Sequence, residues 1–239
     1  MILINDDCFN YLKEIKSNSI DLILVDPPYL ISRNSNFQKH SESTDQFMVT
    51  KYNMSIDFGD WDKEDLDWDL LFKEYYRVLR KGGTLLIFFD IWKSNIMKEC
   101  AEKNKFKQPR VCSWVKNNPV PINSKLNYLS NSTEYFFTFV KGKKPTFNSE
   151  YDNGIYRYPL CHGKERLEHP TQKPLGLISE LILKHTNPGD IVLDTFAGSG
   201  TTGHACQINN RDFILVERDK KYFDIINNRL NFANKEGIE

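Results

Sequence analysis

Short apolar runs alternate along this chain with segments of helical spacing, and this alternation restricts the fold more than any other feature. Strands are expected at residues 2–4, 21–25, 84–89, 111–116, 134–141, 191–196 and 213–217. Helices are expected at residues 9–15, 70–79, 94–103, 174–185, 201–208 and 221–232. The pattern predicts an α/β fold, with a mostly parallel sheet and helices on both faces. A chain of 239 residues, 40% of them hydrophobic, suits a single domain over residues 1–239.

Three long polar stretches interrupt the alternation, near residues 30–65, 117–133 and 142–168. Loops of this length without regular structure are usually functional or disordered. In parallel sheets, ligands lie beyond the carboxyl ends of the strands, so the functional site is expected at that edge.

Composition excludes some classes of protein and leaves others open. The 32 Lys and Arg residues balance the 32 Asp and Glu residues, which does not decide on a nucleic-acid partner, because binding needs only a local basic face. The five cysteines are scattered without a CxxC pair, so neither a metal site nor a disulfide framework is expected. An odd cysteine count without an export signal fits a reducing cytoplasm. No apolar run approaches the roughly 20 residues that span a bilayer, so no membrane partner is expected.

A glycine-rich turn, residues 194–203 (DTFAGSGTTG), follows one of the buried strands. Gly198 and Gly200 allow the backbone to approach a ligand closely, and the helix that follows begins with free N–H groups. Glu217 ends the next strand about 20 residues later, where a carboxylate suits ribose hydroxyls. The turn therefore predicts a ligand that contains a nucleoside.

Two other interpretations of this turn stay open. The fingerprint G-x-G-x-x-G of a dinucleotide oxidoreductase is present at Gly198, Gly200 and Gly203. However, Asp194 ends the strand just before the turn, where a carboxylate repels a pyrophosphate and suits the cationic amino group of a methionine moiety. The plainest interpretation is an ordinary strand-to-helix turn with helix-capping Ser and Thr residues.

The tetrapeptide Asp26-Pro27-Pro28-Tyr29 directly follows another buried strand. Its prolines fix φ and remove two N–H donors, which gives a stiff platform for a carboxylate, backbone carbonyls and an aromatic ring. This set suits an aromatic exocyclic amine, which is a poor nucleophile because its lone pair is delocalised. Asp26 and the Pro27 carbonyl can accept its two hydrogens, and Tyr29 can stack on a base taken out of the helix. A polyproline turn that simply ends the strand is the alternative.

Together these motifs resemble the β-group amino-methyltransferases of bacterial restriction-modification systems. In that family the Asp-Pro-Pro-Tyr motif precedes the glycine loop, as it does here. A third motif, residues 169–174 (HPTQKP), also lies where the family has it, opening the helix before the glycine strand. Segments 57–62, 114–119 and 132–135 extend the resemblance over nearly the whole chain. The chain is most similar to small members without a large inserted recognition domain.

The resemblance implies a Rossmann-like seven-stranded sheet, mostly parallel with one antiparallel strand, in which the catalytic half comes first and the cofactor half second. The strands near Trp114 and Phe137 are expected to form the antiparallel pair. The implied cofactor is S-adenosylmethionine, and the implied catalytic residues are Asp26, Pro27, Pro28 and Tyr29. The implied cofactor-binding residues are Asp7 and Cys8 for the adenine, Asp194, Phe196, Ala197 and Gly198 for the methionine part, Ser199, Gly200 and Thr201 in the same turn, Glu217 for the ribose, and Thr171 and Lys173, which would close over the cofactor.

The implied function is site-specific methylation of DNA at N6 of adenine in a flipped base. N4 of cytosine is the main alternative, although the family more often has Ser before Pro-Pro-Tyr for that target. Carbon-5 methylation is not expected, because the chain has no Pro-Cys pair. A methyltransferase of structured RNA or of a protein amide, and a non-catalytic nucleic-acid-binding module, are weaker alternatives. The implied partners are DNA, a cognate restriction endonuclease and a second copy in a homodimer.

The three polar stretches are expected to supply the DNA surface, because the sheet and helices are occupied. Their cations suit phosphates and their asparagines suit base edges, although each is also an ordinary loop residue. The cations are Arg33, Lys39, Lys51, Lys125, Lys141, Lys143, Lys144, Lys164 and Arg166. The asparagines are Asn117, Asn118, Asn123, Asn127 and Asn131. Trp61 is expected to contact DNA, to cover the pocket or to anchor its loop to the core.

Overall fold

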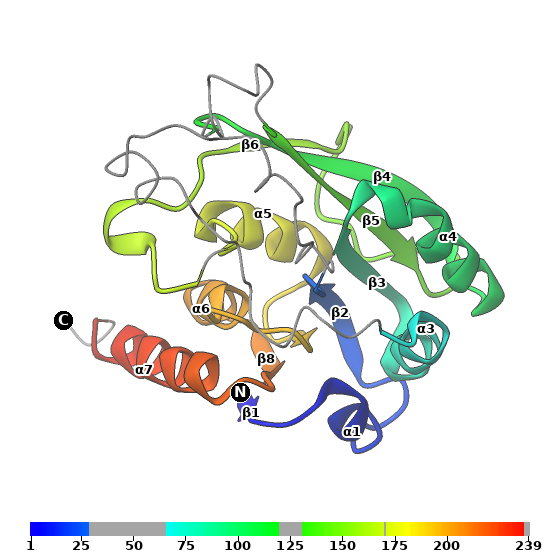
Figure 1. Ribbon diagram of the computed structural model, residues 1–239. Coiled ribbons are helices and arrows are strands. Elements are labelled where there is room, and N and C mark those ends of the chain that lie inside the picture. The colour runs from blue at the N-terminus through cyan, green and yellow to red at the C-terminus, as the bar shows by residue number, and fades with distance from the viewer. Residues whose placement is uncertain (29–65, 120–130, 170, 237–239) are drawn as a thin grey trace, which may run out of the picture.

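A computed structural model shows one sheet with helices on both of its faces (Figure 1). It describes residues 1–28, 66–119, 131–169 and 171–236. In spatial order the eight strands of this part of the chain are β1 (Ile2–Ile4), β8 (Asp212–Val216), β7 (Ile191–Asp194), β2 (Ile20–Val25), β3 (Leu79–Phe89), β5 (Thr133–Val140), β4 (Lys107–Lys116) and β6 (Ile155–Tyr158). The helices are α1 (Cys8–Leu12), α3 (Trp68–Val78), α4 (Ser94–Lys103), α5 (Leu175–His185), α6 (Thr201–Ile208) and α7 (Lys220–Glu236), with 3-10 turns η3 (Ile91–Lys93) and η4 (Gly163–Glu165).

The direction of the strands confirms the predicted fold class. β5 runs antiparallel to both of its neighbours, β3 and β4, and every other pairing among the described strands is parallel. The expected count of seven strands is wrong, because β6 adds an eighth within the stretch 142–168 that was expected to be irregular. The sequence of this strand contains no apolar run from which it could be predicted. Its side chains alternate between solvent and core, since Ile155 is 48% exposed and the adjacent Tyr156 is buried.

Alternating side chains in the central strands explain why helices cover both faces. In β3, Leu85 and Ile87 face a core shared with α1, α3 and α4. Leu86 and Phe88 face a second core shared with α5, α6 and α7. Successive residues of a strand point to opposite faces, so an unbroken apolar run requires a helical layer on each side.

β3 is also longer than the sequence predicts. It begins at Leu79 and continues through Gly82 and Gly83, which were expected only to end the preceding helix. Backbone hydrogen bonds hold this extension, since the Gly82 N–H donates to the Lys141 carbonyl (2.8 Å) and the Lys141 N–H donates to the Gly83 carbonyl (3.1 Å). The extension depends on a partner strand about 60 residues away in the sequence, which local spacing does not reveal.

The two acidic motifs follow neighbouring strands of this sheet. β2 and β7 pair in parallel, with Leu22 opposite Val192 and Ile23 opposite Leu193. After β7 the chain forms α6 in the second core, whereas α3, which follows β2, lies in the first core. The crevice at the carboxyl ends of such strands is the usual ligand site of these sheets.

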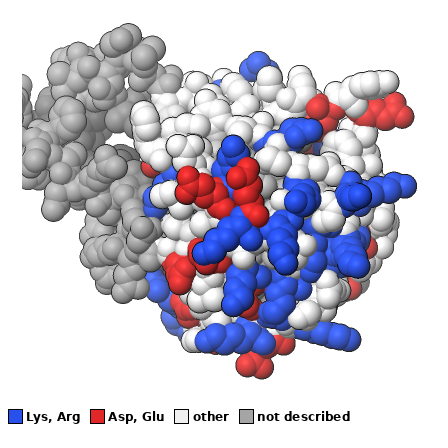
Figure 2. Space-filling view, turned by 90° about the vertical axis from the view of Figure 1, so that its right-hand side faces the viewer, with Lys and Arg blue, Asp and Glu red and all other residues white. Residues whose placement is uncertain are grey.

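The opposite edge of the sheet is rich in exposed cations, and Figure 2 shows Lys and Arg gathered on the side of the molecule that carries α4 and the start of β4. We call Lys81, Lys105, Lys107, Arg110, Lys143 and Lys144 the cationic edge. Segments 79–84, 104–111 and 140–146, which supply these side chains, contain no Asp or Glu. A hydrogen bond from Gln108 Nε2 to the Lys143 carbonyl (2.6 Å) joins two of these segments.

Within the described ranges, no helix is both long enough and apolar enough to cross a bilayer. In the same residues no cluster of three or more His, Cys, Asp or Glu side chains is placed to hold a metal ion. All five cysteines are free thiols.

Candidate active site at the carboxyl edge of the sheet

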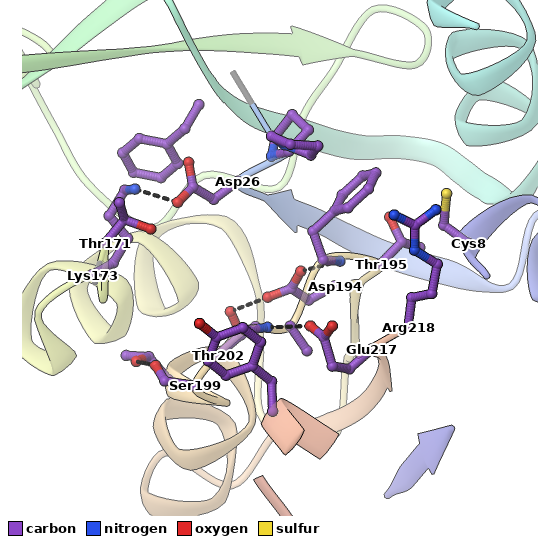
Figure 3. Close-up of a pocket in the computed structure, with 18 of the residues that line it drawn as sticks. Cys8, Asp26, Thr171, Lys173, Asp194, Thr195, Ser199, Thr202, Glu217 and Arg218 are labelled. Carbon is purple, nitrogen blue, oxygen red and sulfur yellow. Dashed lines mark hydrogen bonds and ion pairs between the residues drawn. The ribbon is translucent and has the colours of Figure 1, made fainter. Parts of the chain in front are cut away.

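A cavity of about 250 Å³ opens at the carboxyl ends of β2 and β7 (Figure 3). It gathers five segments that are far apart in the sequence, namely residues 6–9, 26–28, 169–173, 194–202 and 217–222. The predicted site residues that line it are Asp7, Cys8, Asp26, Pro27, Pro28, Thr171, Lys173, Asp194, Phe196, Ala197, Gly198, Ser199, Thr201 and Glu217. Gly200 does not line it, and Tyr29 lies outside the described residues.

Asp194 lies at the bottom of this cavity with only 4% of its surface exposed. Its Oδ1 accepts a hydrogen bond from the Phe196 N–H (3.0 Å) and its Oδ2 accepts one from the Thr202 hydroxyl (2.6 Å). Burial raises the pKa of this carboxyl to about 7, against the effect of the two hydrogen bonds. Because its hydrogen-bond donors are neutral, Asp194 would gain from a cationic ligand in the cavity.

The glycine turn brings backbone to the cavity wall and leaves no room for larger side chains. Gly198 has φ +52°, and a Cβ on it would lie 2.9 Å from Nε2 of His169. Gly200 has φ +74° and directly precedes α6, where a Cβ would lie 3.0 Å from Cγ2 of Ile226 in α7. Gly198 therefore shapes the cavity, whereas Gly200, which was expected to contact the cofactor, allows α6 to pack on α7.

Glu217 follows the end of β8 on the same side of the cavity. Its Oε2 accepts a hydrogen bond from the Gly198 N–H (2.7 Å) and its Oε1 accepts one from the Asp219 N–H (2.8 Å). Burial raises the pKa of this carboxyl above its ordinary value. These contacts fix the carboxylate beside the glycine turn, and Figure 3 shows it below Asp194.

The start of α1 forms the wall opposite the glycine turn. Asp7 caps this helix, because its Oδ1 accepts a hydrogen bond from the Phe9 N–H (2.9 Å). Burial raises the pKa of the Cys8 thiol to about 12, so this side chain stays neutral and is not a nucleophile. Asp7 and Cys8 therefore form a partly polar part of the cavity wall, and neither supplies a reactive group.

Asp26 follows β2 and forms an ion pair with Lys173, which the chain brings back from the segment before α5 (Figure 3). Lys173 is only 7% exposed, and its Nζ lies 4.9 Å from the ring centroid of Phe88. It also lies 3.2 Å from Oε2 of Glu134 in β5. The sequence resemblance assigned Lys173 to closure over the cofactor; the geometry adds a direct contact with the carboxylate of the Asp-Pro-Pro-Tyr motif.

His169 joins the cavity from the other end of the same motif. Its ring lies 4.6 Å from that of Tyr222, measured between centroids. Burial lowers the pKa of this imidazole to about 4, and the nearby Lys173 adds to the shift. His169 is therefore uncharged at neutral pH and forms part of the packed wall.

Several residues line the cavity that sequence reasoning did not select. They are Asp6, Phe9, Leu24, Leu66, Phe88, Gln172, Ile178, Thr195, Thr202, Arg218 and Tyr222. Thr202 could have been predicted, because it lies in the same glycine-rich segment as Asp194. Glu134 was also not selected as a site residue: it contacts Lys173 rather than lining the cavity. Its signals in the sequence are its place in segment 132–135 of the resemblance and at the start of an aromatic strand.

The predicted DNA-contacting residues divide into four groups. Arg33, Lys39, Lys51, Trp61, Asn123, Lys125 and Asn127 lie outside the described residues. Lys141 is buried, and its Nζ donates to Asn18 Oδ1 (2.8 Å) and to the Tyr76 carbonyl (2.5 Å), so a role for it in contacting DNA is wrong. Lys143 and Lys144 are exposed but belong to the cationic edge, away from the cavity. Lys164, Arg166, Asn117, Asn118 and Asn131 are exposed.

Comparison with known proteins adds to this geometry. Residues 20–228 match a family described as DNA methylase. The type II methyltransferase M2.DpnII of Streptococcus pneumoniae is 32% identical, over 98% of this chain and 91% of its own length. M2.MboI of Moraxella bovis is 30% identical, over 93% and 85%.

Two solved structures have a similar fold. The M1.HpyAVI–SAM complex has a TM-score of 0.70 at 29% identity and covers 96% of this chain and 99% of its own. The cytosine-N4-specific PvuII DNA methyltransferase has a TM-score of 0.70 over 98% of this chain and 91% of its own, at 15% identity, and so bears on the fold alone.

Proposed function

This chain belongs to the DNA methylase family, and from that membership we propose that it transfers the methyl group of S-adenosylmethionine to N6 of adenine in DNA. One observation carries the proposal: Asp26, just after β2, and Asp194, the last residue of β7, line the same cavity. The M1.HpyAVI–SAM complex, at 29% identity, supports S-adenosylmethionine as the methyl donor.

Five carboxylates line the cavity, those of Asp6, Asp7, Asp26, Asp194 and Glu217, and their negative character fits this cofactor better than a dinucleotide. Asp194 is the residue that would pair with the amino group of the methionine part, and Glu217 is the one that would accept hydrogen bonds from ribose hydroxyls. Asp7 and Cys8 would lie against the adenine. A pyrophosphate would be repelled by Asp194 and Glu217 and would have only Arg218 and Lys173 as nearby cations among the described lining residues. When bound, S-adenosylmethionine supplies a methyl group activated by its positively charged sulfur.

Asp26 and the Pro27 carbonyl would act on the target amine. Hydrogen bonds to both amine hydrogens favour a pyramidal nitrogen whose lone pair can attack the methyl carbon. As the nitrogen–carbon bond forms and the carbon–sulfur bond breaks, the amine gives up one proton, for which the Asp26 carboxylate is the nearest acceptor. In this proposal the base is flipped out of the duplex, and Tyr29 stacks on it.

We propose adenine rather than cytosine as the target because Asp, rather than Ser, precedes Pro-Pro-Tyr in this chain. The same chemistry at N4 of cytosine is the alternative, since both targets are exocyclic amines on an aromatic ring. The proposal also includes a place in a restriction-modification system, in which methylation protects DNA from a cognate endonuclease, and assembly as a homodimer.

The decisive experiment follows tritium from labelled S-adenosylmethionine into duplex DNA that contains many short sequence contexts, and then identifies the modified nucleoside by mass spectrometry. We expect N6-methyladenine. N4-methylcytosine would replace the adenine assignment, and absence of label from DNA, with the cofactor bound, would remove the proposed function. Methylation-sensitive sequencing of a genome that expresses the chain then gives the recognition site.

A further inference from the structure

Four charged side chains of alternating sign run from the cavity into the sheet. Asp26 pairs with Lys173, Lys173 Nζ lies 3.2 Å from Oε2 of Glu134, and Oε1 of Glu134 lies 2.9 Å from Nζ of Lys116 in β4. They come from the end of β2, the segment before α5, the start of β5 and the end of β4. We call these four residues the charge chain.

Shielding from solvent makes the charge chain different from a surface ion pair. The side chains of Lys173 and Lys116 are 7% and 11% exposed, and those of Asp26 and Glu134 are 22% and 25% exposed. Phe88 covers one side of Lys173 and Trp114 lies 5.4 Å from Lys116 Nζ. Removing one partner from such a set leaves the next charge uncompensated, which costs far more than removing an exposed pair.

We infer that Glu134 is a positioning residue for methyl transfer, which holds the Lys173 ammonium between two carboxylates and so fixes the orientation of Asp26 at the cavity. This inference rests on the role proposed for Asp26. Glu134 itself does not line the cavity, so in this inference it acts through its contact with Lys173.

The alternative is that Glu134 merely links β5 to β4 through Lys116. The pKa of Lys173 distinguishes the two roles, because it depends on the charges around the ammonium. Burial alone lowers the pKa of Lys173, but the charges of Asp26 and Glu134 outweigh burial and raise the pKa above its ordinary value. Among the described residues, Lys173 also affects His169, which is uncharged at neutral pH. If Glu134 holds the ammonium, its removal must make Lys173 lose its proton at lower pH.

The test compares Glu134→Gln with Glu180→Gln in the full-length protein. Glu180 in α5 is a matched control, because it is also a glutamate paired with a lysine (Lys184, 2.5 Å) but lies outside the cavity and the charge chain. For Glu134→Gln we expect kcat to fall by about tenfold to a hundredfold, as for a small misplacement of a reacting group. The Kd for S-adenosylmethionine should stay within about twofold, and the alkaline limb of the kcat–pH profile should move to lower pH. Glu180→Gln should change none of these.

A second measurement tests the inference without requiring that the protein methylate DNA. Nuclear magnetic resonance of the lysine side chains, assigned with Lys173→Arg, follows the titration of Lys173 in both variants. Titration at lower pH in Glu134→Gln supports the inference, and unchanged titration overturns it, whether or not the wild-type chain methylates DNA. An unchanged kcat–pH profile in an active Glu134→Gln enzyme also overturns it. Failure of the wild-type chain to label DNA removes the proposed function instead.

Discussion

Asp26 and Asp194 have opposite electrostatic surroundings, although each lies at the carboxyl end of a buried strand and lines the same cavity. Asp26 is held by the ammonium of Lys173. Among the described residues, the Thr202 hydroxyl and the Phe196 N–H donate hydrogen bonds to Asp194, and burial raises its pKa to about 7. Environments that differ in this way assign different tasks to two chemically identical groups. We therefore expect substitutions at the two positions to have separable effects on transfer and on cofactor binding.

Asp26→Ala is expected to remove methyl transfer and to leave cofactor binding within about threefold. The decrease in rate should be at least about a hundredfold, because proton acceptance and alignment of the amine typically contribute about 10²–10⁴. Single-turnover transfer measures the first effect and isothermal titration calorimetry the second. A variant that methylates DNA at nearly the wild-type rate would exclude Asp26 from the reaction.

Asp194→Asn is expected to weaken cofactor binding and to stabilise the free protein. A carboxyl group whose pKa rises on folding binds more protons in the folded state, so its ionisation destabilises the fold as the pH rises from about 4 to 7. The melting temperature of Asp194→Asn should therefore exceed that of the wild type most above pH 7, and the difference should shrink toward pH 4. Wild-type affinity for S-adenosylmethionine should fall as the pH drops below 7, because protonated Asp194 no longer attracts an ammonium.

The control is Asp190→Asn, because Asp190 is a half-buried aspartate that does not line the cavity. The same pH dependence of stability in both variants would contradict the assignment to Asp194.

Local chemistry explains which of these residues could be found from sequence. Asp194 and Gly198 belong to one short turn, and Glu217 ends the next strand, so spacing alone suggested that they share a ligand. Asp26 and Lys173 are 147 residues apart, and only the closed sheet brings them together. Glu134 lies in segment 132–135, which the resemblance singled out, but its contact with Lys173 could not be predicted, because that contact requires β5 to be inserted between β3 and β4.

At the scale of elements, apolar runs predicted strands well where both faces are buried and poorly at the edges. β2 and the second half of β3 carry nearly unbroken apolar runs and were expected close to where they are, whereas the first half of β3 was not predicted. β6 has four residues that alternate between solvent and core, and it is held by pairing with β4 through Ser113 to Lys116. Such an edge strand depends on its partner rather than on its own sequence.

The turn before α6 gives a prediction about the cost of packing two helices closely. Gly200→Ala should lower the free energy of unfolding by more than about 1–2 kcal/mol, the cost of a left-handed backbone for a residue with a side chain. The excess arises because Cβ would lie 3.0 Å from Ile226 and α7 would have to shift. Gly189→Ala is the control, since Gly189 has φ +83° but nothing within 4 Å of its Cβ position among the described residues. Equal destabilisation of the two variants in urea denaturation would show that α7 yields without cost.

At the scale of the whole molecule, the sheet separates two surfaces of different charge. The acidic cavity lies at the carboxyl ends of β2 and β7, and the cationic edge lies at the amino ends of β3 and β4. β3 has 11 residues, which corresponds to a length of about 36 Å. A chain with equal numbers of acidic and basic residues is thus strongly polarised, which composition alone did not reveal.

We expect this polarity to govern how the protein attracts DNA before it finds a target base. The triple variant Lys105→Gln/Lys107→Gln/Lys143→Gln should reduce the slope of log affinity against log salt for non-specific duplex DNA, by up to about 0.9 for each phosphate that the protein no longer neutralises. Because these side chains lie at the edge opposite the cavity, kcat on a saturating short duplex should stay within about twofold. Fluorescence anisotropy at several salt concentrations measures the slope, and Lys105→Arg/Lys107→Arg/Lys143→Arg, which keeps the charge, should restore it. An unchanged slope in the glutamine variant would mean that the cationic edge takes no part in attracting DNA.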